Sequence, residues 1–170
     1  MTGMTASDST AKEPPRAGPE TVKLVCFRLH GQEYAVDIAD VKETMALRPI
    51  TRVFLTPPWL AGIINLRGDI VAVLDLACLC GLSPTDINGE SRIVIVQRDT
   101  RVAGIVVDEL AELRTLELAD VQPPPVTIAG EAAAILTGVV TLESGAAVRV
   151  IDMQSLFESE RLRAFQRGGS

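Results

Sequence analysis

The amino-acid sequence predicts a mainly β protein, made of two small packed β-barrels and one C-terminal helix. Three observations lead to this fold class. The chain contains many short runs rich in valine and isoleucine, two of its predicted hairpins repeat at a nearly constant spacing, and only its end shows the spacing of an amphipathic helix. Many short strands with little helix are typical of small barrels and sandwiches.

The expected strands are short and end at residues that favour turns. The turn segments include His30-Gly31-Gln32, Arg67-Gly68-Asp69, Asp99-Thr100 and Glu143-Ser144-Gly145. The strands are expected at residues 22–29, 34–36, 63–66, 70–74, 93–97, 102–107, 139–142 and 148–151.

The repeat joins two of these predicted hairpins. Gly62-Ile63-Ile64-Asn65-Leu66 matches Gly138-Val139-Val140-Thr141-Leu142, and Val73-Leu74-Asp75-Leu76 matches Val150-Ile151-Asp152-Met153. The offset is 76 residues and then 77, so the two turns differ by one residue. Another strand-turn-strand unit precedes each hairpin, and a proline-marked connection follows that unit. Chance similarity of apolar strands is the alternative. Two halves of about 70 residues predict paired barrels, each marginally stable alone.

The two ends of the chain differ from this pattern. Residues 1–20 contain no Leu, Ile, Val or Phe and several prolines, so they are expected to be a disordered tail. A terminal helix is expected from about Met153 to Phe165, with arginines at its C-terminal end. The folded domain then covers residues 21–160, while residues 161–170 hold the end of the helix and a frayed tail.

Composition restricts the possible partners. A net charge of −6 and a pI near 4.8 argue against nucleic acid or an anionic membrane, since both require a basic face. The three cysteines Cys26, Cys78 and Cys80 show no disulfide spacing, and a zinc site needs more ligands than one histidine supplies. Without a signal peptide or a long apolar span, a soluble protein of a reducing compartment is expected.

Several residues could be read as functional, but each also has a structural explanation. Asp75 and Asp152 follow strands and precede short apolar helices, so N-capping is preferred over catalysis. Gly104 interrupts a β-branched run, which indicates either a bulge or a partner lying over the strand. His30 lies in a turn with no nucleophile at motif spacing, and no phosphate-binding loop is present. Arg67-Gly68-Asp69 spells an integrin ligand, which acts only outside cells.

The segment Gly62-Ile63-Ile64-Asn65-Leu66-Arg67-Gly68, followed by Ile70-Val71-Ala72-Val73-Leu74-Asp75-Leu76, resembles the signature of the CheW family. These are the coupling proteins of bacterial chemosensory arrays. Further segments are similar to the family pattern, and the likeness runs from about residue 22 to residue 158. These segments are Phe27 to Ile38, Val41-Lys42-Glu43, Pro57 to Gly62, Gly104 to Asp108, Leu136-Thr137-Gly138 and Val150-Ile151-Asp152.

The resemblance implies two packed five-stranded SH3-like β-barrels and no enzymatic activity or cofactor. It implies a cytoplasmic adaptor, recruited to chemoreceptor arrays, that binds the cytoplasmic tip of a chemoreceptor and the regulatory domain of the CheA histidine kinase. Other CheW-like proteins in rings are further possible partners. The positions carried over to the receptor contact are Glu43, Gly62, Asn65, Leu66, Arg67, Gly68 and Gly104.

In this interpretation, the Arg67 guanidinium forks onto a receptor group, and Gly68 and Gly104 keep the surface low enough for a helix to approach. The kinase contact is expected on a separate, more apolar barrel surface whose residues the sequence does not identify. Two alternatives remain open. One is an adaptor of a twitching, gliding or developmental pathway, and the other is an enzyme or small-molecule binder on the same scaffold.

Overall fold

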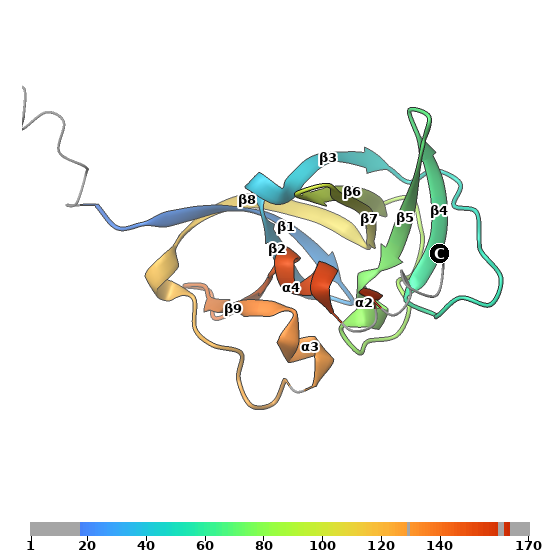
Figure 1. Ribbon diagram of the computed structural model, residues 1–170. Helices are drawn as coiled ribbons and strands as arrows, with labels where there is room; N and C mark the ends of the chain where they lie inside the picture. Colours follow the sequence, from blue (N-terminus) through green and yellow to red (C-terminus); the bar gives the residue numbers. More distant parts are fainter. Residues whose placement is uncertain (1–17, 129, 160–161, 164–170) are drawn as a thin grey trace, which may run out of the picture.

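The computed structural model describes residues 18–128, 130–159 and 162–163, and its strands form two five-stranded sheets (Figure 1). The first sheet has the strand order β8-β1-β2-β10-β9 and the second has the order β3-β6-β7-β5-β4. The fold class predicted from the sequence is therefore confirmed. The predicted tail over residues 1–20 lies mostly outside the described residues, as does the frayed end after residue 163.

The first sheet consists of β1 (Thr21–Leu29), β2 (Gln32–Asp37), β8 (Glu109–Glu117), β9 (Leu136–Thr141) and β10 (Ala147–Ile151). The second consists of β3 (Val41–Ala46), β4 (Leu60–Leu66), β5 (Asp69–Asp75), β6 (Arg92–Arg98) and β7 (Arg101–Val107). The helices are η1 (Ile38–Asp40), α2 (Leu76–Leu79), η2 (Leu118–Asp120), α3 (Glu131–Ala134) and α4 (Met153–Glu158). None of the helices in the described ranges is both long and apolar enough to span a bilayer.

The two sheets are not consecutive halves of the chain, so the prediction of two sequential halves is wrong in its connectivity. Hairpin β1–β2 joins the last hairpin through the parallel pair β2·β10, and hairpin β6–β7 joins β4–β5 through the parallel pair β5·β7. The strand that follows the hairpin β1–β2, and the strand that follows the hairpin β6–β7, each join the other sheet. β3 pairs with β6, and β8 pairs with β1. The first sheet therefore comes from residues 21–37 and 109–151, and the second comes from residues 41–107.

One bridge in each sheet brings its two edges together, and a glycine makes the approach possible. After β3, the backbone of Thr51 exchanges two hydrogen bonds of 2.9 Å with Ile63 of β4. After β8, Gln122 exchanges bonds of 2.9 and 2.8 Å with Val139 of β9. A Cβ on Gly62 would lie 2.3 Å from the Thr51 carbonyl oxygen, and one on Gly138 would lie 2.2 Å from that of Gln122. The repeated glycines therefore close both sheets.

Three apolar clusters stabilise this arrangement. One lies within the second sheet and includes Ile64, Leu66, Val73, Ile93 and Ile95, and a second lies within the first sheet around Leu24, Cys26 and Val148. The largest cluster combines residues of both sheets with α2 and α4, among them Phe27, Val36, Leu74, Ile105, Met153 and Phe157. The two sheets therefore share a core in addition to their own, as the prediction of marginal single barrels requires.

The short helices confirm the two predicted N-caps. The Asp75 carboxylate accepts a hydrogen bond from Cys78 N, and that of Asp152 accepts from Gln154 N at 3.0 Å. The terminal helix is shorter than predicted, because α4 ends at Glu158 and Ser159 adopts an extended conformation with ψ of 149°. Leu162 N donates to Ser159 Oγ at 3.5 Å, and the Leu162 side chain is buried. Phe165 lies outside the described residues.

Candidate functional site

The turn between β4 and β5 presents an arginine in an unusual backbone conformation. Leu66 pairs with Asp69, so Arg67 and Gly68 form a two-residue loop, and both have positive φ values, 52° and 93°. This combination matches a type I′ turn, whose twist suits a hairpin. The Asn65 side chain accepts a hydrogen bond of 2.9 Å from Gly68 N and fixes the turn. A left-handed conformation costs a non-glycine residue about 1 kcal/mol, so Arg67 is not the residue that the turn itself favours.

The Arg67 guanidinium makes a bidentate contact with Glu43 of β3. Its Nη1 donates to Glu43 Oε2 at 2.6 Å and its Nη2 donates to Oε1 at 2.8 Å. The hydrogen bonds from Arg67 lower the pKa of Glu43, and Glu43 raises the pKa of Arg67. The Arg67 side chain stays 68% exposed, so three of its five N–H groups remain for a partner. The bidentate contact expected of the Arg67 guanidinium is thus present, but its acceptor within this chain is Glu43.

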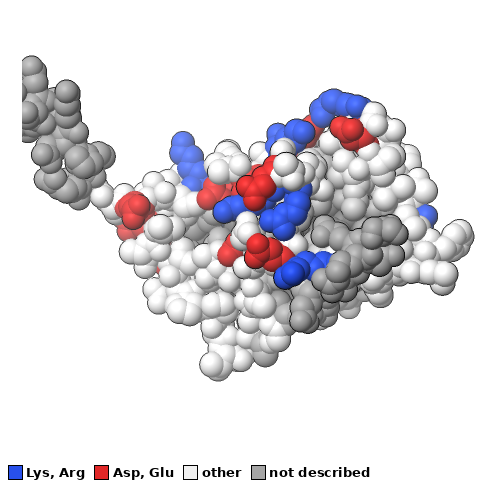
Figure 2. Space-filling view, viewed as in Figure 1, with Lys and Arg blue, Asp and Glu red and all other residues white. Residues whose placement is uncertain are grey.

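These residues lie at one end of the molecule. The β4–β5 hairpin projects beyond the rest of the second sheet in Figure 1, and Figure 2 shows basic and acidic side chains in contact in the same region. Arg48 Nη1 donates to the carbonyl oxygen of Asn65 at 3.0 Å. Beside it is an open hollow of about 330 Å³, lined in part by Ile63 and by Ile70, whose side chain is exposed. We call Glu43, Asn65, Arg67 and Gly68 the hairpin surface.

Three of the predicted contact residues are buried and do not belong to the hairpin surface: Gly62, Leu66 and Gly104. Gly62 closes the second sheet, and Leu66 belongs to the core of that sheet. Gly104 lies in β7, where the pairing with β6 and β5 continues without a register shift, so the predicted bulge is wrong. A Cβ on Gly104 would lie 3.1 Å from Ile93 Cγ2, which means that its open side faces the core. The hairpin surface therefore does not include Gly104.

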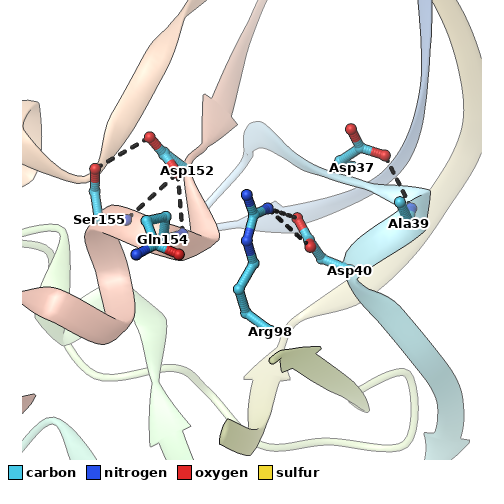
Figure 3. A network of polar contacts seen from close by, with 7 residues as sticks. All are labelled: Asp37, Ala39, Asp40, Arg98, Asp152, Gln154 and Ser155. Atoms are coloured by element: carbon cyan, nitrogen blue, oxygen red, sulfur yellow. Dashed lines mark hydrogen bonds and ion pairs between the residues drawn. The ribbon is translucent and has the colours of Figure 1, made fainter. Parts of the chain in front are cut away.

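A second polar network lies at the junction of the two sheets (Figure 3). Arg98 of β6 binds the carboxylate of Asp40 at 3.1 Å, and Asp37 caps η1 by accepting from Ala39 N at 2.9 Å. Asp152, the N-cap of α4, also accepts from Ser155 Oγ at 3.1 Å. Each carboxylate in this network has a structural partner. The Arg98–Asp40 pair is not predicted from the sequence, because its members are far apart in the chain.

The residue types that carry catalysis are engaged in structural contacts. His30 Nε2 lies 2.7 Å from the carbonyl oxygen of Ser83, and His30 N donates to Asp108 Oδ2 at 2.7 Å. Burial raises the pKa of the Cys26 thiol to about 12 and that of Cys80 to about 11, so neither is a thiolate at neutral pH. Within the described ranges, no three His, Cys, Asp or Glu side chains form a group that could hold a metal ion.

Known proteins resemble the chain over most of its length. A family model described as a CheW-like domain matches residues 23–161. The chemotaxis protein CheW of Klebsiella aerogenes is 31% identical, covering 84% of this chain and 87% of the relative. The protein FrzA of Myxococcus xanthus is 30% identical, covering 89% and 94%. The crystal structure of the scaffolding protein TtCheW from Thermoanaerobacter tengcongensis superimposes with a TM-score of 0.75 at 31% identity, covering 88% of this chain and 96% of that one.

Proposed function

The chain belongs to the CheW family, and from this premise we propose that it is a non-enzymatic adaptor that couples chemoreceptors to the CheA histidine kinase. The match of the family model to residues 23–161 carries this proposal. The engaged carboxylates, thiols and histidine give an enzymatic reading no support. In this role the phosphotransfer chemistry belongs to the kinase, and the adaptor supplies binding surfaces.

We assign the receptor contact to the hairpin surface. Glu43 holds the Arg67 guanidinium in one orientation on an exposed turn, so little side-chain freedom is lost when a partner binds. The free N–H groups of Arg67 suit a carboxylate, amide or carbonyl oxygen on a receptor helix. Gly68 adds no side chain above the turn, and nothing lies within 4 Å of where its Cβ would be. A helix can therefore approach closely, with Ile70 as an apolar neighbour.

The assignment predicts that Arg67→Glu abolishes co-sedimentation of the purified chain with receptor-bearing membranes while its melting temperature stays close to the wild-type value. The substitution replaces the donor fork with a carboxylate beside Glu43, so a receptor acceptor loses its partner. Lys23→Glu on β1 makes the same change in charge at an exposed site of the first sheet and should bind normally.

The double variant Arg67→Glu/Glu43→Arg separates binding from folding, because it restores an ion pair with its charges exchanged. We expect it to fold like the wild type and still fail to co-sediment. Recovery of binding in the double variant, or unfolding of Arg67→Glu, would show that the pair is structural and would remove the hairpin surface from the receptor contact.

A second candidate is the same adaptor role in a twitching, gliding or developmental pathway. The chain is about as similar to FrzA of Myxococcus xanthus, at 30% identity, as to the chemotaxis protein CheW of Klebsiella aerogenes, at 31%. The binding chemistry would be the same in both cases. A deletion strain scored for swimming and for movement on surfaces distinguishes the two pathways.

A further inference from the structure

An open groove of about 640 Å³ lies in the second sheet's half of the molecule, between the connection over residues 47–58 and the loop over residues 84–87. It shares Arg48 and Pro49 with the hollow beside the hairpin surface, but its lining includes none of the four hairpin-surface residues. Most of the lining is apolar. The apolar residues include Leu47, Pro49, Ile50, Pro58, Ile87 and Val106.

Large apolar side chains extend around this groove into solvent. Ile87 in its wall is 56% exposed. Between the lining residues Arg52 and Pro58, the same connection carries Phe54, which is 95% exposed, and Leu55, which is fully exposed. Leu55 also has a φ of 62°, a left-handed conformation that costs such a residue about 1 kcal/mol. Exposed large apolar side chains such as Phe54 and Leu55, which are neighbours in the chain, are typical of interaction sites.

Hydrogen bonds fix both walls of the groove. On one side, the Thr51–Ile63 bridge anchors the connection to β4, and Thr56 Oγ1 donates to the carbonyl oxygen of Val53 at 2.7 Å. On the other side, Thr85 donates to the Asp75 carboxylate twice, at 3.0 Å from its N and 2.9 Å from its Oγ1. The groove therefore exists before any partner arrives, and binding does not have to order it.

Two arginines, Arg48 and Arg52, line the groove although the whole chain has a net charge of −6, and the exposed Asp86 lies between the lining residues Thr85 and Ile87. Arg52 is exposed, and in the described part of the chain it forms no ion pair or hydrogen bond. Arg48 uses one nitrogen on the carbonyl oxygen of Asn65. Among the described residues that line the groove, only Asp75 carries a carboxylate, which is buried and bound to Thr85. Charge complementarity therefore favours an acidic partner.

We propose that this groove binds an amphipathic helix of a partner protein, with two apolar side chains one turn apart and a carboxylate beside them. The apolar side chains pack against Ile87 and Pro58, Phe54 and Leu55 cover the outer side, and the carboxylate binds Arg52. This is a helix-in-groove contact, in which apolar anchors supply affinity and the charge supplies orientation. It goes beyond the proposed adaptor function, because it adds a contact that is separate from the hairpin surface.

The test uses the full chain and two fluorescein-labelled helical peptides. Both peptides carry leucines along one face, flanked by glutamates in one peptide and by lysines in the other. Fluorescence anisotropy is expected to show tighter binding of the glutamate peptide by about tenfold, the effect of one charge-assisted contact. Arg52→Glu should reverse the preference. Ile87→Asp should weaken the binding of both peptides.

Lys23→Glu is the control, because it changes the net charge equally at a site on the first sheet and should leave the preference unchanged. Arg67→Glu should behave like Lys23→Glu, which keeps this test independent of the receptor contact. Equal affinity for the two peptides would overturn the proposal. An effect of Lys23→Glu as large as that of Arg52→Glu, or normal binding by Ile87→Asp, would do so as well.

Discussion

Arg67 shows how one residue links local strain to a binding surface. Its φ of 52° suits asparagine or glycine better, and such conformations persist where surrounding contacts hold them. The two hydrogen bonds that Arg67 donates to Glu43 supply that contact. The sequence predicted the turn and the importance of Arg67, and the family resemblance gave Glu43 as a receptor contact, not as the partner of Arg67. The pair could not be predicted because Glu43 lies on β3, a strand that the apolar pattern does not reveal.

Other single residues were easier to predict. An aspartate that follows a strand and precedes an apolar helix has one obvious use, so Asp75 and Asp152 were assigned correctly as N-caps. Gly104 was not, because a glycine inside a strand pattern has the same sequence signature whether it forms a bulge or leaves room for core side chains. Only the neighbours Ile93, Ile95 and Val73, which come from other strands, distinguish these cases.

His30 gives a prediction at the same scale. The hydrogen bond to the carbonyl oxygen of Ser83, with the nearby charge of Asp108, raises its pKa above the ordinary 6.5. The protonated imidazole therefore stabilises the fold. This stabilisation is complete below pH 6.5 and is lost as the pH rises through the higher pKa of the folded state. Because the chain has one histidine, its single imidazole signal in an NMR titration should show a midpoint above 6.5.

The matching control is His30→Gln, which removes the titrating group and keeps a side-chain donor at this position. Its urea midpoint should change less than that of the wild type between pH 6 and pH 8. An imidazole midpoint at or below 6.5 would contradict the contact between the β1–β2 turn and the loop that contains Ser83.

At the scale of elements, the sequence predicted local pairs and missed distant ones. The hairpins β1–β2, β4–β5, β6–β7 and β9–β10 all join neighbouring runs, and each was expected. β3 and β8 were not, since their sequences VKETMA and ELAELRTLE contain charged residues and no β-branched run. Both are edge strands, where polar side chains protect the sheet from further pairing. The parallel pairs have no local signature at all.

The closing bridges give a prediction at this scale. Gly138→Ala would place a Cβ 2.2 Å from the carbonyl oxygen of Gln122, so the bridge to Val139 must shift or break. Overpacking of this kind should lower the free energy of unfolding by about 2 kcal/mol in urea titrations. Gly89→Ala is the control, since nothing lies within 4 Å of that position and its φ is not left-handed. Equal stability of both variants would exclude a closing role for Gly138.

For the whole molecule, the shared core makes the two sheets depend on each other. Phe157 of α4 is 2% exposed and packs in the cluster that contains residues of both sheets. The sequence suggested such an interface from the small size of each half, but it could not identify the members. These residues come together because β3 and β8 pair with strands from the other half of the chain. The apolar pattern of a single strand does not reveal that pairing.

Phe157→Ala should therefore destabilise both sheets together, by about 3–5 kcal/mol. Hydrogen exchange would show this as an equal loss of protection for the slowest amides of β2 and β7, one strand from each sheet. Leu113→Ala, on an exposed side chain of β8, should change stability by no more than about 0.5 kcal/mol. Loss of protection in one sheet alone would mean that the sheets unfold independently.

Because β3 and β8 each pair with strands from the other half of the chain, the two sheets receive their full sets of strands at different points of translation. The hairpin β1–β2 is translated before the strands that pair with it, because β8 and β10 follow only after β7. The sheet of β3 to β7 has all its strands once residue 107 has left the exit tunnel. A nascent chain therefore completes the sheet of β3 to β7 first, and the hairpin β1–β2 has no other strand of its own sheet to pair with until β8 emerges.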